Sequence, residues 1–153
     1  MINYKTISTF RSHLSRLLKV KRHVYTNVEN EIQREFSGKP IEQVRQNNDM
    51  ILLEGELIII KLRLPDKKQH LSRKDGFRLI YLVSKTDEIV VFLDIYPKNG
   101  PLQQLDLPDE DLKSLVREFI VEAQLGSLKD YTIQQPCCSV LPTIMIPFHY
   151  ISI

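Results

Sequence analysis

Three runs rich in β-branched and aliphatic residues follow one another closely in the middle of the chain, at residues 50–64, 76–84 and 88–96. Such runs are typical of strands. Only three residues, Lys85 to Asp87, separate the second run from the third, and this spacing favours an antiparallel hairpin. The chain therefore has to accommodate an antiparallel sheet, in which we expect residues 50–64 to form a central strand.

Apolar residues at helical spacing predict three helices that cover this sheet. The first two, over residues 9–18 and 24–36, are expected to form an N-terminal helical hairpin. The third is expected over residues 108–124, because acidic residues occupy its first turn and Gly126 follows its end. Residues 2–8 alternate and predict a short edge strand. This order predicts an α+β fold, a small antiparallel sheet packed by helices on one face, with the last helix C-terminal to the strands.

The length of 153 residues fits a single domain, which we place at residues 1–130. Residues 131–153 carry no charged side chain. Their three prolines argue against a membrane-spanning helix, so we expect an extended tail packed on the domain or on a partner, with no membrane contact. The N-terminus lacks the apolar stretch of a secretory signal, and Cys137 and Cys138 are adjacent, which favours a reducing, cytoplasmic location.

The formal net charge of +2 conceals a segregation of charge along the chain. The net charge is +5 over residues 1–40, −3 over residues 41–60, +6 over residues 61–85 and −6 over residues 86–153. Local charge rather than total charge decides what a surface binds, so the two basic blocks are candidates for a binding surface.

Basic side chains gather on one face of the predicted sheet, because successive residues of a strand point to opposite faces. Alternation also places Asp94 beside Tyr96, with Val91 on the opposite face, and puts Tyr81 in the core. Such a surface suits phosphate groups, although charged residues on strands and loops are often no more than solvated. The expected face consists of Lys61, Arg63, Arg78, Tyr96 and Lys98, and the loop beside it adds Lys67, Lys68, Arg73 and Lys74 as RNA-binding residues.

Several common catalytic patterns are absent from the sequence. It has no glycine-rich phosphate loop, no cysteine and histidine pattern at zinc spacing, no G-x-S-x-G and no HExxH. The four histidines are scattered, so we expect no metal site and no cofactor. The basic face nevertheless carries the residue types that metal-free RNA cleavage requires. That reaction needs proton removal from the 2′-hydroxyl, cations around the phosphorane and a proton donor for the 5′-oxygen.

Four segments, taken in order, resemble the RelE/ParE superfamily of toxins from type II toxin–antitoxin systems, more on the RelE side. They are FRSHLSRLLKVKR at residues 10–22, IIIKLRL at residues 58–64, GFRLIYLV at residues 76–83, and IVVFLDIYPKNG at residues 89–100, followed by a helix that opens with proline and acids. The resemblance covers residues 4–125. It implies a small antiparallel sheet with an N-terminal helical hairpin and a further helix.

The resemblance also implies a function. It implies an endoribonuclease that cuts messenger RNA, usually in the ribosomal A site, and a cognate antitoxin that neutralises it in a hetero-oligomer. Carried over by position, Lys61 and Arg63 match the family's K-x-R strand, and Arg78 matches its phosphate-stabilising arginine. Lys98 matches the basic position after the last strand, and Tyr96 stands where a tyrosine or another polar group is common.

The sequence departs from the family pattern in three places. The loop between residues 64 and 76 is longer than in the shortest members, residues 97–100 lack an additional arginine, and no histidine matches the histidine-based subgroup. No residue is therefore assigned as the general base. Two alternatives stay open: a ParE-like or non-catalytic toxin that acts by binding a protein such as gyrase, and an interaction domain without catalysis.

Overall fold

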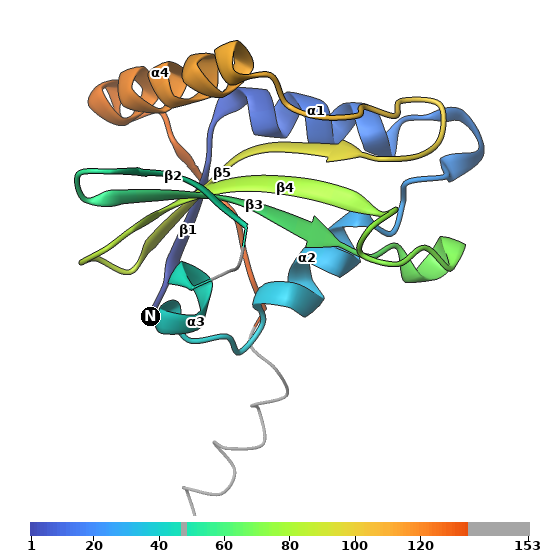
Figure 1. Cartoon of the computed structure of the whole chain (residues 1–153), viewed down its shortest axis with the longest axis horizontal. Coiled ribbons are helices and arrows are strands. Elements are labelled where there is room, and N and C mark those ends of the chain that lie inside the picture. Colours follow the sequence, from blue (N-terminus) through green and yellow to red (C-terminus); the bar gives the residue numbers. More distant parts are fainter. Residues whose placement is uncertain (47–48, 135–153) are drawn as a thin grey trace, which may run out of the picture.

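The computed structural model describes residues 1–46 and 49–134, which form an α+β fold, as the sequence predicts (Figure 1). Two short 3-10 turns, η1 at Lys21–His23 and η2 at Lys67–Gln69, interrupt the connections. The strands are β1 (Asn3–Thr6), β2 (Met50–Glu54), β3 (Leu57–Leu64), β4 (Phe77–Ser84), β5 (Ile89–Pro97) and β6 (Lys129–Asp130), and the helices are α1 (Ser8–Leu18), α2 (Val28–Phe36), α3 (Ile41–Arg45) and α4 (Asp109–Leu125).

The strands form one mostly antiparallel sheet in the order β2-β3-β4-β5-β1-β6. The expected hairpin of β4 and β5 is present, with Leu79 opposite Ile95. β1 runs parallel to β5, with Asn3 opposite Ile89, and its other side pairs with β6. The predicted edge strand therefore has neighbours on both sides, and the two-residue β6 forms that edge of the described sheet.

The prediction of one strand over residues 50–64 is wrong, because the chain turns back at Gly55 and Glu56. Gly55 has a φ of 57°, a conformation that glycine adopts without a steric penalty. β2 is thus a separate strand that pairs antiparallel with β3 as far as Ile60. Beyond Ile60, residues 61–64 of β3 pair with β4 on one side but with no described strand on the other, so they lie at the edge of the sheet.

Helices cover both sides of the sheet, not one side as the sequence predicts. Figure 1 shows α4 on the opposite side from α2 and α3, with α1 running beside β5. Phe10 of α1 and Phe36 of α2 both lie with their ring centroids 5.3 Å from that of Phe92 on β5. α1 and α2 therefore do not form the expected helical hairpin, and each of them packs against β5 instead. Tyr81 is buried in the core, and its hydroxyl donates to the carbonyl of Val44 at 2.7 Å.

The first residues of the expected C-terminal tail lie on the domain. The ring of Tyr131 packs against Phe92 at 5.3 Å, and its hydroxyl donates to Glu29 at 3.0 Å. The backbone N–H of Gln134 donates to the side chain of Gln33 at 2.8 Å. The rest of the tail, residues 135–153, is outside the described residues. Within the described part of the chain, no helix has the length and apolar character that crossing a membrane requires.

Candidate functional site

Three of the predicted site residues form a row near one end of three neighbouring strands. Arg63 on β3 lies opposite Arg78 on β4, and Arg78 lies opposite Tyr96 on β5. In the next row, Lys61 lies opposite Ile80, and Ile80 lies opposite Asp94. Residues in register on neighbouring strands point to the same face of a sheet, so the register brings Lys61, Arg63, Arg78 and Tyr96 together. We call these four residues and Lys98 the basic face.

The sequence led us to expect that the whole basic face is solvated, but only part of it is. The side chains of Lys61 and Arg63 are 26% and 52% exposed, whereas Arg78 and Tyr96 are buried. The guanidinium of Arg78 donates to the backbone carbonyls of Arg73 at 3.0 Å, Lys74 at 2.9 Å and Phe77 at 3.2 Å. Burial, followed by the charge of Arg63, lowers the pKa of Arg78. The contacts of Arg78 therefore hold the loop that precedes β4.

The hydroxyl of Tyr96 is buried and has no hydrogen-bond partner among the described residues. Burial, with a further contribution from the carboxylate of Asp106, raises the pKa of Tyr96 to about 12. The phenol therefore stays protonated at neutral pH, and it can donate a proton or a hydrogen bond.

A carboxylate of the chain itself lies against two of the cations. Asp106, in the connection between β5 and α4, forms an ion pair with Lys61 at 3.2 Å. The ammonium group of Lys98 donates to the carbonyl of Leu105, the residue before Asp106. The backbone N–H of Leu107 and then Lys61 hold the pKa of Asp106 below its ordinary value. Lys61 and Lys98 thus both bind residues 104–107, which we call the acidic segment.

Beside the basic face, the edge of β3 borders a hollow of about 400 Å³. Arg73 donates to the carbonyl of Arg63 at 2.8 Å and pairs with Glu35 at 2.9 Å, and Asp49 lies 3.7 Å from Arg63. Two predicted RNA-binding residues therefore share this hollow with Lys61 and Arg63. The lining of this edge hollow is Glu35, Asp49, Lys61, Leu62, Arg63, Arg73 and Lys74.

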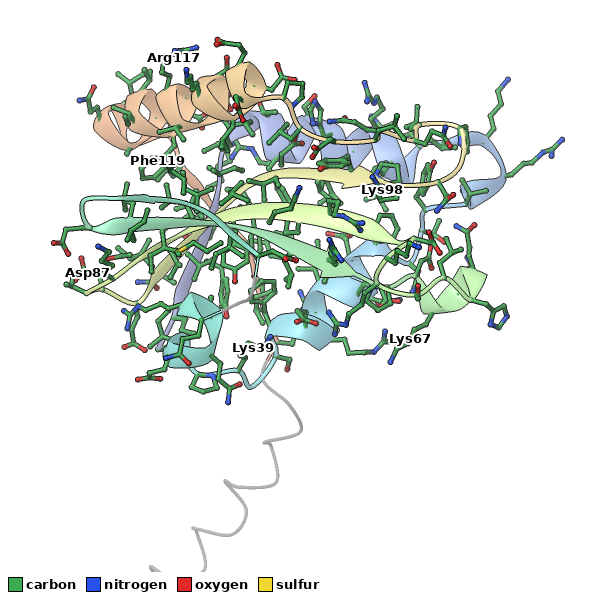
Figure 2. All side chains as sticks on the ribbon, in the orientation of Figure 1. Lys39, Lys67, Asp87, Lys98, Arg117 and Phe119 are labelled. Carbon is green, nitrogen blue, oxygen red and sulfur yellow. The ribbon has the colours of Figure 1, made fainter. Side chains whose placement is uncertain are left out.

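The other two predicted RNA-binding residues lie apart from the basic face. The ammonium group of Lys68 donates to the hydroxyl of Thr26 at 2.6 Å, and the backbone N–H of Lys67 donates to Glu31 at 2.7 Å. Figure 2 shows Lys67 below the sheet, away from Lys98, which follows the end of β5. The structure therefore divides the predicted loop residues, with Arg73 and Lys74 next to the site and Lys67 and Lys68 near the start of α2.

A β-bulge changes the predicted alternation on β5. Ile80 lies opposite Asp94, but the next residue of β4, Tyr81, lies opposite Phe92, so that Leu93 is an extra residue. Val91 therefore lies on the same face as Asp94, whereas strict alternation places it on the opposite face. A period of two cannot reveal a bulge, because the extra residue is itself apolar and buried.

An imidazole–carboxylate pair, which the sequence does not reveal, lies at the β5 end of the Lys61 row. His13 Nδ1 of α1 is 2.5 Å from Asp94 Oδ1, and the side chain of Asp94 is only 4% exposed. The hydrogen bond from Asp94 raises the pKa of His13 against the opposing influence of burial. These two residues help to line a hollow of about 220 Å³, which we call the His13 pocket, together with Thr9, Gln104, Leu107, Asp111, Ser114, Leu115 and Glu118.

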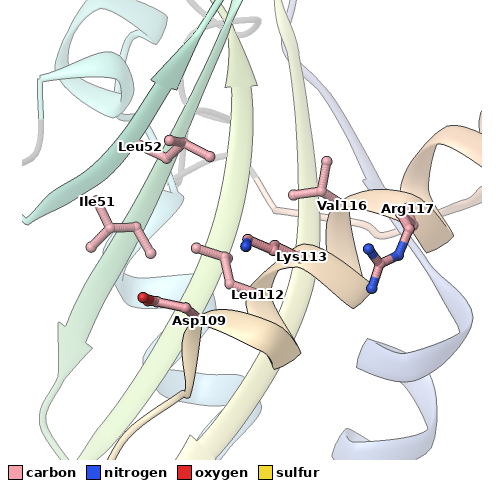
Figure 3. A pocket seen from close by; sticks show the side chains of 7 residues that line it. All are labelled: Ile51, Leu52, Asp109, Leu112, Lys113, Val116 and Arg117. Carbon is pink, nitrogen blue, oxygen red and sulfur yellow. The ribbon is translucent and has the colours of Figure 1, made fainter.

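An apolar hollow of about 490 Å³ lies between the edge strand β2 and α4. Figure 3 shows Ile51 and Leu52 of β2 on one side of it and Leu112 of α4 on the other, with Lys113 and Arg117 along the helix. All four apolar residues Met50, Ile51, Leu52 and Leu53 of β2 are exposed. We call this hollow the β2–α4 groove.

Within residues 1–46 and 49–134, no group of three or more histidine, cysteine, aspartate or glutamate side chains is placed to hold a metal ion. The described cations of the basic face and edge hollow are the groups available to bind an anion there. No protein-family model, curated protein or solved structure matches the chain.

Proposed function

We propose that this protein is a RelE-like toxin of a type II toxin–antitoxin pair, which cleaves messenger RNA on the ribosome without a metal ion. The observation that carries the proposal is the binding of the acidic segment by the basic face, where Lys61 holds the carboxylate of Asp106 at 3.2 Å. Carboxylates and phosphates are bound by the same charge-assisted hydrogen bonds. The side chain of Asp106 is 71% exposed, so an RNA phosphate can compete with it for Lys61.

Each residue of the basic face has a role in this proposal. Lys61 and Arg63, which are partly exposed, neutralise the scissile phosphate, and Lys98 binds the neighbouring backbone. Arg78 acts through the loop it holds, because its guanidinium is bonded to backbone carbonyls. Tyr96, with its pKa of about 12, supplies the proton that the leaving 5′-oxygen requires, and its buried hydroxyl has to become accessible when the RNA displaces the acidic segment.

The edge hollow extends the same surface along the RNA. Four of its lining residues are cationic and two are acidic, and its cations include Arg73 and Lys74. Contacts of this kind are electrostatic and release counterions, so RNA binding should weaken steeply as salt is raised.

The test is the cleavage of translated messages after induction of the protein in growing cells. Lys61→Ala should lower the cleavage rate by about 10²–10³-fold, the usual cost of one preorganised donor to a transition state. Lys85→Ala is the matched control, because Lys85 is an exposed lysine in the β4–β5 hairpin, far from the basic face. Its backbone N–H donates to the carbonyl of Glu56, a bond that alanine keeps. The control should cut at the wild-type rate.

Mapping of the RNA ends completes the test. Purified protein and programmed ribosomes should give a 2′,3′-cyclic phosphate and a 5′-hydroxyl, the products of attack by the 2′-hydroxyl. Wild-type cleavage by Lys61→Ala, or products that carry a 3′-hydroxyl and a 5′-phosphate, contradict the proposal. DNA replication that stalls while messages stay intact supports the second candidate, a toxin that binds a protein, which the exposed β2–α4 groove favours.

The same groove is where we place the antitoxin. β2 is an edge strand with exposed apolar residues, and an extended segment can add to such an edge through backbone hydrogen bonds. Lys113 and Arg117 lie beside the groove and favour a segment that carries acidic as well as apolar side chains.

A further inference from the structure

The pair of His13 and Asp94 has the geometry of an oriented proton-transfer group. Asp94 Oδ1 contacts His13 Nδ1 at 2.5 Å and also accepts the backbone N–H of Ile95 at 2.8 Å, so the buried carboxylate is fixed in place. A carboxylate at one nitrogen sets the tautomer and the orientation of an imidazole. The nitrogen left for chemistry is Nε2, on a ring that is about one-third exposed and lines the His13 pocket.

The pair belongs to the same face of the sheet as the cations. Asp94 and Lys61 lie in one row with a single strand between them, and Tyr96 is the next residue of β5 on that face. Two strand spacings separate the backbones of Lys61 and Asp94 by about 10 Å.

The acidic segment connects the two halves of this surface. Gln104 and Leu107 line the His13 pocket, while Asp106 between them binds Lys61. A phosphodiester that displaces Asp106 from Lys61 therefore comes to lie next to the wall of the His13 pocket. A nucleotide on its 5′ side would then have its 2′-hydroxyl within reach of the imidazole.

We infer that His13 is the general base of the proposed ribonuclease and that Asp94 is its positioning residue. Neutral Nε2 takes the proton of the 2′-hydroxyl, and the 2′-oxygen forms a bond with phosphorus. The bond from phosphorus to the 5′-oxygen breaks, and this oxygen takes the proton of the Tyr96 hydroxyl. Exchange with water then removes the proton from His13 and returns one to Tyr96. The inference rests on the proposed function and supplies the base that its reaction requires.

Charged groups on three elements face His13 and set the pH dependence. Asp94 on β5 raises the pKa of His13 by its hydrogen bond, burial and Arg16 on α1 lower it, and Glu118 on α4 raises it. Asp111, also on α4, lines the same pocket. Because the net pKa is raised and the base has to be neutral, the cleavage rate should fall on the acid side at a pH above the ordinary histidine value of about 6.5.

The experiment measures single-turnover cleavage on programmed ribosomes as a function of pH. His13→Asn should lower the rate by about 10²–10⁴-fold and remove the acid limb of the profile, since Asn keeps a donor for Asp94 but cannot take a proton. Asp94→Asn should move that limb to lower pH, because the influence that raises the pKa of His13 is lost. The control is His23→Asn, a change of an exposed histidine with a φ of 50°, which asparagine tolerates.

Two further measurements separate the outcomes. Binding of an RNA with a 2′-deoxy substitution at the cleavage site should be the same for wild type and His13→Asn. Wild-type rates in His13→Asn overturn the inference and leave the proposed function standing, whereas a wild-type protein that cuts no RNA overturns both. A lower rate with an unchanged pH profile and a matching loss of stability to urea also overturns the inference, because a purely structural pair behaves in this way.

Discussion

Arg78 shows how far a residue type can be interpreted before its contacts are known. The resemblance makes it the arginine that stabilises the phosphate, and alternation puts it on the correct face. In the structure, its guanidinium donates to the backbone carbonyls of Arg73, Lys74 and Phe77. Its effect on RNA is therefore expected to be indirect, through the position of the loop that carries Arg73 and Lys74.

This contact predicts a stability difference between two arginines of one row. Arg78→Met leaves backbone carbonyls of the loop without their donor and should lower the free energy of unfolding by about 1–3 kcal/mol. Arg63→Met, at a side chain that is 52% exposed, should change it by only about 0.5 kcal/mol. Urea unfolding of the two variants measures both values, and equal values would show that the carbonyl contacts of Arg78 do not stabilise the loop.

At the residue scale, the sequence reveals which side chains share a strand face, because alternation is a local property. It does not reveal the partners of those side chains. His13 and Asp94 are 81 positions apart, and no spacing rule connects a helix residue with a strand residue at that distance. Likewise, the sequence shows Asp106 only as one acidic residue of the block at residues 86–153. Its contact with Lys61 depends on how the connection after β5 folds back.

At the scale of elements, the strands after residue 57 agree with the apolar pattern, and the departures occur where one residue changes the chain's direction. Gly55 divides an apolar run into β2 and β3, and Leu93 adds a bulge to β5. The bulge at Leu93 leaves the run of apolar residues unbroken, so a search for strands by hydrophobicity does not detect it. The turn does interrupt the run, because Gly55 stands between Glu54 and Glu56, and the prediction of one strand passed over this turn signal. The turn makes β2 an edge strand, and the bulge places Val91 on the same face as Asp94.

Gly55, in the turn between β2 and β3, and Gly76, directly before β4, make a matched pair for substitution. A Cβ added to Gly76 would collide with the carbonyl oxygen of Leu64, whereas a Cβ at Gly55 meets no atom within 4 Å. Gly55→Ala carries only the cost of a positive φ, about 1–2 kcal/mol. Gly76→Ala should cost more and should also lower RNA cleavage, because it moves the β3–β4 junction next to Arg63 and Arg78. Thermal unfolding and cleavage assays measure the pair, and a more stable Gly76→Ala than Gly55→Ala would contradict this account.

At the scale of the whole molecule, the fold brings the charge blocks of the sequence into contact. The basic block of residues 61–85 becomes β3, its loop and β4, and the acidic segment from the C-terminal block lies against it through Lys61 and Asp106. The fold class follows from the order of the predicted elements. The placement of helices on both sides does not, because periodicity says which face of a helix is buried but not which side of the sheet it covers.

The β2–α4 groove predicts how a protein partner binds. Leu52→Asp places a charge in the apolar groove and should weaken binding of the proposed antitoxin by at least about tenfold, or 1.4 kcal/mol. Leu125→Asp, at an α4 residue that is 75% exposed and outside the groove lining, is the control. Calorimetric titration measures both, with RNA cleavage by the free variants as a check on folding. Unchanged affinity for Leu52→Asp places the partner elsewhere.

The pairing of β1 has a consequence for the order of events during synthesis. β1 emerges first, yet Asn3 finds its partner at Ile89 and Lys5 finds its partner at Asp130. Such distant pairs slow folding, and a nascent chain cannot form them until the later residues have been made. α1 follows β1 directly and contacts β5, so His13 has no Asp94 to bind while the early part of the chain is being translated. If the proposed function holds, the chain is therefore harmless to the ribosome that is producing it until most of its residues have been made.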